Sequence, residues 1–251
     1  MSGHSKWSSI KHKKGAADAK RGQLFSKLSR ALIVAAREGG PDPDGNIALA
    51  NAIAKAREAS MPKDTIERAI ARGSGAGVDG DAYEGVTYEG YGPSGVAILV
   101  DALTDNRNRT AAEVRHIFAK HDGNLGASGA VAWLFERKAL ALVDGERYDE
   151  EEVMLAAAEG GAEDVEPDGS SLRITAPAEI VQSLRDALGS AGIEVESADV
   201  TMLPKTTVEV EDEVTARKIL RLMDALDEND DVQDVYANFD IPERVLEAVA
   251  P

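Results

Sequence analysis

Apolar residues return every three or four positions through most of the first 72 residues of the chain. This spacing places them on one face of a helix. It predicts helices over 23–38 and 46–59, and a third that begins near Pro62 and ends at Gly73. Proline is tolerated in the first turn of a helix and glycine commonly follows the last, so the limits of the third helix agree with its pattern.

A glycine-rich stretch, GSGAGVDG at 73–80, follows the third helix. Its last six letters match G-x-G-x-x-G, but a dinucleotide-binding loop must follow a strand and open a helix. This stretch follows a helix and precedes a strand. It is therefore interpreted as a flexible linker.

After the linker the pattern favours strands. Two strands within 85–103 are joined at YGPSG, 91–95, which is interpreted first as a hairpin turn and second as a ligand loop. An amphipathic helix is predicted over 109–121 and a third strand over 130–137. These elements begin a sheet.

The next block is self-contained and has the order βαββαβ of a ferredoxin-like unit. Its predicted elements are strands over 139–143, 163–166, 171–175 and 193–200, and helices over 149–159 and 178–190. The strand, helix and strand predicted within 206–238 cannot bury their apolar faces alone. They are expected to return to the sheet begun at 85–137.

The predicted fold class is α+β multidomain, with a helical N-terminal domain followed by two α/β ferredoxin-like domains, one inserted in the other. The limits are a basic helical domain over 1–72 with a leader over 1–22, the linker over 73–80, a discontinuous domain over 81–138 plus 203–251, and an inserted domain over 139–202.

Composition narrows the class of protein. The chain has 251 residues, 43% of them hydrophobic, which is enough to bury a core. No apolar run approaches the length of a membrane span, and no apolar region follows the charged N-terminus as in a secretory signal. The absence of cysteine suits a reducing compartment, so a cytoplasmic location and no membrane partner are expected.

Charge is distributed unevenly along the chain. Residues 1–72 carry 14 Lys and Arg against 7 Asp and Glu, a net of +7. Residues 73–251 carry 14 against 38, a net of −24. A charge run is often only a solvated surface. Here the basic segment, 1–72, would be attracted to the acidic remainder of its own chain unless a polyanion bound it. Nucleic acid is the commonest large polyanion in cytosol.

The predicted nucleic-acid contacts gather in this basic segment. They are Lys6, Trp7, Lys11, His12, Lys13, Lys14, Lys20 and Arg21, with Lys27 and Arg30 extending the set along the first helix. Trp7 has two interpretations, since its ring could stack on an exposed base or anchor the leader to the first domain.

The stretch TDNRNRT, 104–110, lies between a predicted strand and a predicted helix. Its Thr, Asp and Asn residues are typical of turns and caps. Arg107 and Arg109 beside a helix N-terminus could also form an anion site, because free backbone donors face outward there, and both are counted among the predicted nucleic-acid contacts. Both interpretations stand at this point.

Catalytic and metal-binding motifs are missing from the sequence. It holds no G-x-S-x-G, G-x-x-x-x-G-K or H-E-x-x-H, and its four histidines lack metal-ligand spacing. Asp105 with His116 is the one pairing that an enzyme hypothesis could test. No metal and no cofactor are predicted, and no RNP-type aromatic runs mark an RNA-binding sheet.

Several segments, in order, resemble one known family. They are HSKWSSIKHKK (4–14), DAKRGQLFSKLSR (18–30), AAREGGPDPDGN (35–46), MPKDTIERAI (61–70), YEGYGPSGVAILV (88–100), TDNRNRT (104–110) and GNLG (123–126). Together they resemble the YebC/PmpR family, bacterial relatives of the mitochondrial translational activator of cytochrome c oxidase. The resemblance implies a cytosolic three-domain protein with a helical N-terminal domain.

The same resemblance implies two kinds of target. Some members of the family are DNA-binding transcriptional regulators, and others are translation factors that act on stalled ribosomes. Charge favours the ribosome mildly, because an acidic body can approach basic ribosomal proteins but is repelled by duplex DNA. A protein-binding scaffold that uses only the acidic domains is a remoter alternative.

Overall fold

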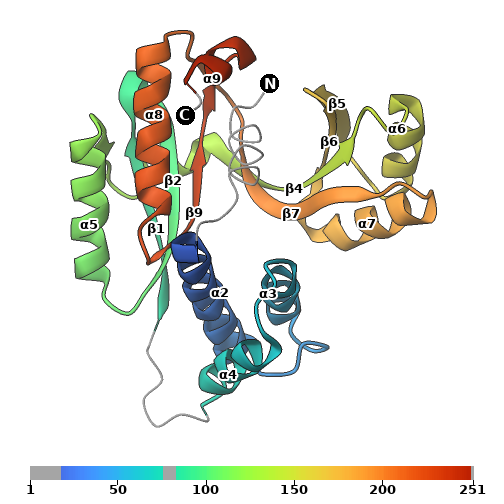
Figure 1. Ribbon diagram of the computed structural model, residues 1–251, viewed down its shortest axis with the longest axis horizontal. Coiled ribbons are helices and arrows are strands. Elements are labelled where there is room, and N and C mark those ends of the chain that lie inside the picture. The colour runs from blue at the N-terminus through green and yellow to red at the C-terminus, as the bar shows by residue number, and fades with distance from the viewer. Residues whose placement is uncertain (1–17, 76–82, 250–251) are drawn as a thin grey trace. The chain divides into compact units, whose positions relative to one another are not determined.

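The computed structural model describes residues 18–75 and 83–249, and these form two compact units (Figure 1). One unit runs from Trp133 to Thr207. The other combines the described residues before Trp133 with those after Thr207. Within the described parts of the chain, no helix has the length and apolar character needed to cross a membrane.

The N-terminal part of the larger unit is helical, as predicted. It consists of α2 (Asp18–Gly39), α3 (Ile47–Glu58) and α4 (Lys63–Gly73). Buried Leu32, Leu49 and Ala56 belong to one core shared by these helices. Asn46 connects the first two, because its amide donates to the Ala35 carbonyl at 2.7 Å and its side-chain oxygen accepts from the Leu49 N–H at 3.1 Å.

The rest of the larger unit is built on an antiparallel sheet with the strand order β3-β1-β2-β9. The strands are β1 (Glu84–Tyr91), β2 (Ala97–Thr104), β3 (Asn124–Leu125) and β9 (Val232–Ala237). The helices are α5 (Arg107–Lys120), α8 (Glu213–Asp227) and α9 (Glu243–Val249). A short parallel pair joins β8 (Val208–Glu209) and β10 (Phe239–Asp240).

One core holds this sheet to its helices. Ile98 and Val100 of β2 pack in it with Phe118 of α5 and Leu222 of α8, all fully buried. The pairing of β9 with β2 confirms that the last strand predicted within 206–238 returns to the sheet begun at 85. The first strand predicted there does not join that sheet, because β8 pairs with β10 instead.

The smaller unit, Trp133–Thr207, confirms the predicted order βαββαβ. Its elements are β4 (Phe135–Asp144), α6 (Glu150–Glu159), β5 (Asp164–Asp168), β6 (Ser171–Pro177), α7 (Val181–Ser190) and β7 (Val195–Pro204). The strand order is β5-β6-β4-β7. Alternate residues such as Ala139 and Ile174 face a core shared with Leu184 of α7, which leaves the opposite face of the sheet uncovered by α6 and α7.

Two predictions about the sheet of the larger unit are wrong. Residues 130–137 do not form its third strand: a 3₁₀ turn covers Ala132–Leu134, and Phe135 opens the long strand β4 of the smaller unit. The larger unit is also not ferredoxin-like, because β1 and β2 are its two central strands and follow each other through a tight turn. That turn has no room for a crossover helix. The domain limits stay a prediction.

Candidate nucleic-acid interface

Six of the twelve predicted nucleic-acid contacts lie outside the described residues. These are Lys6, Trp7, Lys11, His12, Lys13 and Lys14. Of the others in the leader, Lys20 is in the first turn of α2 and the Arg21 side chain is exposed to solvent. Their contact with nucleic acid stays a prediction.

The two predicted cations farther along α2 meet acidic residues of their own chain. Lys27 is buried and pairs with the Asp227 carboxylate, Nζ to Oδ1 3.2 Å. Arg30 pairs with the Asp231 carboxylate at 3.4 Å and donates to the carbonyl of Asp230. These two positions are three apart and therefore share one face of the helix. That face therefore meets the last residue of α8 and the loop between α8 and β9.

TDNRNRT caps α5, as the structural interpretation predicts. The Asn106 side chain accepts a hydrogen bond from the Arg109 N–H at 3.1 Å. The two arginines also have acidic partners: Arg107 lies 3.6 Å from the Glu84 carboxylate, and Arg109 Nη2 lies 2.8 Å from Asp105 and 2.7 Å from Asp231. These hydrogen bonds, to Asp231 and then to Asp105, raise the pKa of Arg109.

Asp231 is the centre of this network, and sequence analysis did not identify it. Its side chain is only 5% exposed, and one carboxylate oxygen accepts from Arg109 and, at 2.6 Å, from the Thr110 hydroxyl. Burial tends to raise the pKa of Asp231, but the hydrogen bonds from Arg109 and Thr110, with the charges of Arg109 and Arg30, hold it below its ordinary value. The sequence holds one indication, since the last strand predicted within 206–238 is expected to join the sheet that contains the strand before TDNRNRT. Its antiparallel pairing with β2 brings TDNRNRT beside the start of β9.

Glu89 is a second buried acid that sequence analysis missed. It lies on β1 within YEGYGPSG, and its carboxylate accepts backbone N–H bonds from Gly129 at 2.6 Å and from Val131 and Ala132 at 2.7 Å. Two of these bonds occupy the backbone donors of Val131 and Ala132, which a strand over 130–137 would need for its ladder, so they disfavour that strand. The carboxylate therefore fixes the loop that follows GNLG.

The motifs YEGYGPSG and GNLG lie side by side because β1 pairs with β3. Gly90 is the point of closest approach: a Cβ there would lie 2.7 Å from the Phe118 ring and 2.8 Å from the Asn124 carbonyl. A larger residue would therefore separate the strand from α5. YGPSG itself is a hairpin turn between β1 and β2, as predicted.

Acid is expected to loosen the loop held by Glu89. Burial tends to raise the pKa of Glu89, but the three backbone hydrogen bonds hold it below its ordinary value of 4.5. A lowered pKa stabilises the fold above the unfolded value, and this contribution is lost as pH falls below about 4.5 and through the folded pKa. Amide exchange at Gly129, Val131 and Ala132, corrected for intrinsic rates, should lose protection over that interval.

Glu89→Gln provides the control for this titration. The amide keeps the size of the side chain but does not ionise in this interval, so exchange protection at the three amides should be lower and independent of acid. Equal pH dependence in the two proteins would show that another group controls the loop.

In the described parts of the chain, the pairing of Asp105 with His116 that an enzyme hypothesis could test is not formed. Asp105 pairs with Arg109, and the structure gives it no contact with His116, which is exposed. Within 18–75 and 83–249, no group of three or more His, Asp and Glu side chains is placed to hold a metal ion.

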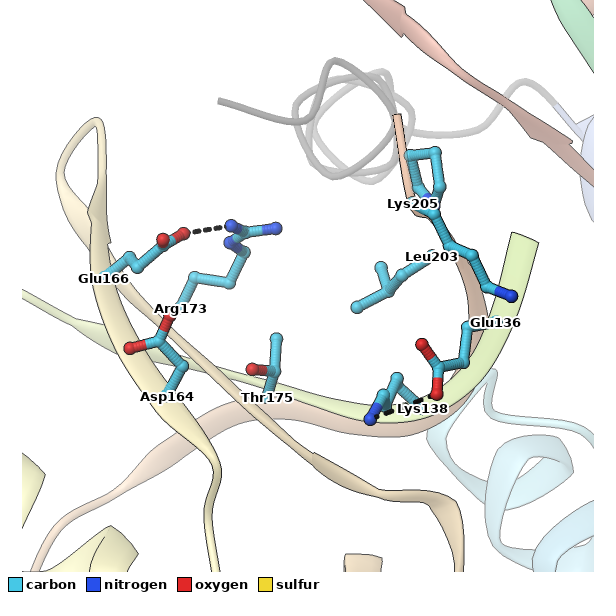
Figure 2. Close-up of a pocket in the computed structure, with 9 residues that line it drawn as sticks. Glu136, Lys138, Asp164, Glu166, Arg173, Thr175, Leu203 and Lys205 are labelled. Carbon is cyan, nitrogen blue, oxygen red and sulfur yellow. Dashed lines mark hydrogen bonds and ion pairs between the residues drawn. The ribbon is translucent and has the colours of Figure 1, made fainter. Parts of the chain in front are cut away.

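A hollow of about 220 Å³ lies on the sheet face of the smaller unit that α6 and α7 leave uncovered. Figure 2 shows the residues that line it. Cations and carboxylates alternate across it. Arg173 pairs with Glu166, and Lys138 lies 3.4 Å from Glu136 and 2.7 Å from Glu163. Because the charges are matched internally, this hollow offers no net attraction to a phosphate.

Comparison with known proteins gives the family. The N-terminal domain of the TACO1/YebC protein matches residues 5–76, and the TACO1/YebC second and third domains match residues 83–239. A probable transcriptional regulatory protein of Rubrobacter xylanophilus is 60% identical, with 100% of each chain covered. A protein of Natranaerobius thermophilus with the same name is 54% identical, with 98% of this chain and 99% of that one covered.

A solved structure gives the same result. The crystal structure of a conserved hypothetical protein from Aquifex aeolicus is 50% identical and matches with a TM-score of 0.80. The match covers 90% of this chain and 93% of that one. This chain belongs to the TACO1/YebC family.

Proposed function

We propose that this protein is a non-enzymatic regulator of gene expression that binds nucleic acid through its basic N-terminal segment. The observation that carries the proposal is the uneven charge, +7 over residues 1–72 and −24 over residues 73–251. A basic segment held on an acidic body attracts phosphates and releases their condensed counterions. The names of the relatives, probable transcriptional regulatory proteins, support a role as regulator.

The proposed target is DNA, in agreement with those names. A second candidate is ribosomal RNA, where the protein would act as a translation factor that relieves stalling. The acidic body favours this candidate: the unit Trp133–Thr207 alone has 6 Lys and Arg against 17 Asp and Glu. Such a surface is repelled by duplex DNA but is attracted to basic ribosomal proteins.

Crosslinking in cells separates the two targets. The full-length protein is crosslinked, and the attached DNA and RNA are sequenced from the same preparation. Promoter DNA in the recovered pool supports transcriptional regulation. A pool dominated by ribosomal RNA supports the translation factor and excludes promoters as the main target.

Salt provides a direct test of the phosphate contacts. If about six phosphates of duplex DNA are neutralised, log K is expected to fall against log[salt] with a slope of about −5. Fluorescence anisotropy with a labelled duplex, titrated at four or more KCl concentrations, measures this slope. A slope near zero would mean that phosphate contacts do not drive binding.

A further inference from the structure

A groove lies between α2 and α4 in the helical part of the larger unit. It has a volume of about 290 Å³. Its lining comprises Phe25, Ser26, Ser29, Arg30, Arg72 and Tyr83, together with the buried side chain of Ile33. We call it the α2–α4 groove. It combines two guanidinium groups, two serine hydroxyls and two aromatic rings.

The charge of the α2–α4 groove distinguishes it from the hollow in Figure 2. Three carboxylates, of Glu136, Asp164 and Glu166, line that hollow among its cations. Among the residues that the structure describes, the lining of the α2–α4 groove holds both Arg30 and Arg72 and no carboxylate. On a chain with net charge −17, such a concave surface favours an anionic ligand.

Arg30 is held in place at one edge of the groove. Its Nη1 faces the carboxylate of Asp231, and its Cζ lies 5.6 Å from the centroid of the Tyr83 ring. Among the described residues, its Nε and Nη2 have no hydrogen-bond partner. A guanidinium positioned in this way can donate to a phosphate.

The aromatic rings add recognition of a base to recognition of a phosphate. Phe25 and Tyr83 are both half-buried, so each ring is supported by the core and still reaches the groove. Bases of single strands stack on such rings, whereas the bases of a duplex are already stacked on each other. Serine hydroxyls can donate to or accept from the sugar and base edges.

We propose that the α2–α4 groove binds one unpaired nucleotide of a single strand whose neighbouring phosphates contact the leader. This rests on the proposed function and specifies part of its site. The last residues of the leader, among them Arg21, belong to α2, and Phe25 is four positions after Arg21, about 6 Å along the helix. One strand can therefore reach both sites.

Variants of the full-length protein test the proposal. Tyr83→Leu removes the ring but keeps an apolar side chain, and Tyr83→Phe keeps the ring. Arg72→Gln removes a groove cation. Arg68→Gln is its matched control, because Arg68 lies on the same helix, is absent from the described groove lining, and donates locally to Asp64 and Thr65. Probes are a labelled 12-nucleotide single strand and the duplex of the same sequence, and thermal melting checks folding.

Tyr83→Leu and Arg72→Gln are each expected to weaken binding of the single strand about tenfold, with duplex binding changed less than twofold. Tyr83→Phe and Arg68→Gln should bind both probes as wild type. Two results overturn the proposal: unchanged single-strand binding in both groove variants, or equal losses on single strand and duplex. The proposed function fails separately, if reversing the charges of the leader lysines leaves binding of both probes intact.

Discussion

Replacing Lys11, Lys13 and Lys14 together with glutamate is expected to weaken nucleic-acid binding at least 100-fold. The three substitutions remove three of about six predicted phosphate contacts and set three negative charges beside the remaining ones. If each contact contributes about 1 kcal/mol, losing three corresponds to more than a 100-fold change in Kd, and repulsion adds to it. Fluorescence anisotropy at about 0.1 M KCl with DNA, and pelleting with ribosomes, measure the effect.

A control variant with the same change in net charge separates the effect of losing contacts in the leader from the effect of the net charge on binding. Lys63, Lys120 and Lys218 are exposed lysines outside the leader, and their replacement with glutamate also changes the net charge by six. This control should bind within about threefold of wild type at that salt, since screening acts over about 10 Å. Equal losses in the two triple variants would show that net charge controls binding and that the leader has no special role.

The pattern of apolar residues was sufficient to predict most elements of the fold. The three N-terminal helices, the hairpin at YGPSG and the βαββαβ order of the smaller unit all follow from local spacing and turn residues, and the structure confirms them. The strand predicted over 130–137 fails for a reason that local spacing does not contain. Glu89, about forty residues earlier, takes the backbone donors of that segment.

The candidate site was predictable only where charge concentrates along the chain. Counting charges identifies the leader, because its cations are close in sequence. It does not identify the partners of Lys27 and Arg30, which are about 200 residues away, at the end of α8 and in the loop after it. Whether a cation pairs with an acid of its own chain depends on tertiary contacts. A run of basic residues therefore shows that a segment is positively charged, but not which of its side chains remain available to a ligand.

The anion site predicted at TDNRNRT illustrates the same limit. The local sequence correctly predicts a cap, since Asn106 and its acceptor geometry involve neighbouring residues. The acid that pairs with Arg109 is Asp231, which directly precedes β9 and is far from Arg109 in the sequence. The pairing of β9 with β2 brings the two residues together. The network that results ties α2, α5 and the start of β9 to a single carboxylate, that of Asp231.

Asp231→Ala is therefore expected to lower the free energy of unfolding of the larger unit by about 2–4 kcal/mol. The substitution leaves the Arg109 and Arg30 guanidinium groups and the Thr110 hydroxyl without their shared acceptor. Removing one partner of a buried ionic and hydrogen-bonded group costs more than the bonds themselves contribute. Urea unfolding of the full chain gives the change. Hydrogen exchange in peptides covering β2 and β9 locates it in this sheet.

Asp234→Ala is the matched control, because it removes the same functional group three residues farther along the chain. Asp234 is exposed on β9, and Asp101 stands directly opposite it on β2. Burial, and the charge of Asp234, hold the pKa of Asp101 above its ordinary value despite a hydrogen bond from Thr87. Removing one of two facing like charges should change stability by less than about 0.5 kcal/mol, or raise it slightly. Equal losses for Asp231→Ala and Asp234→Ala would contradict the central role of Asp231, since only Asp231 joins the two arginines.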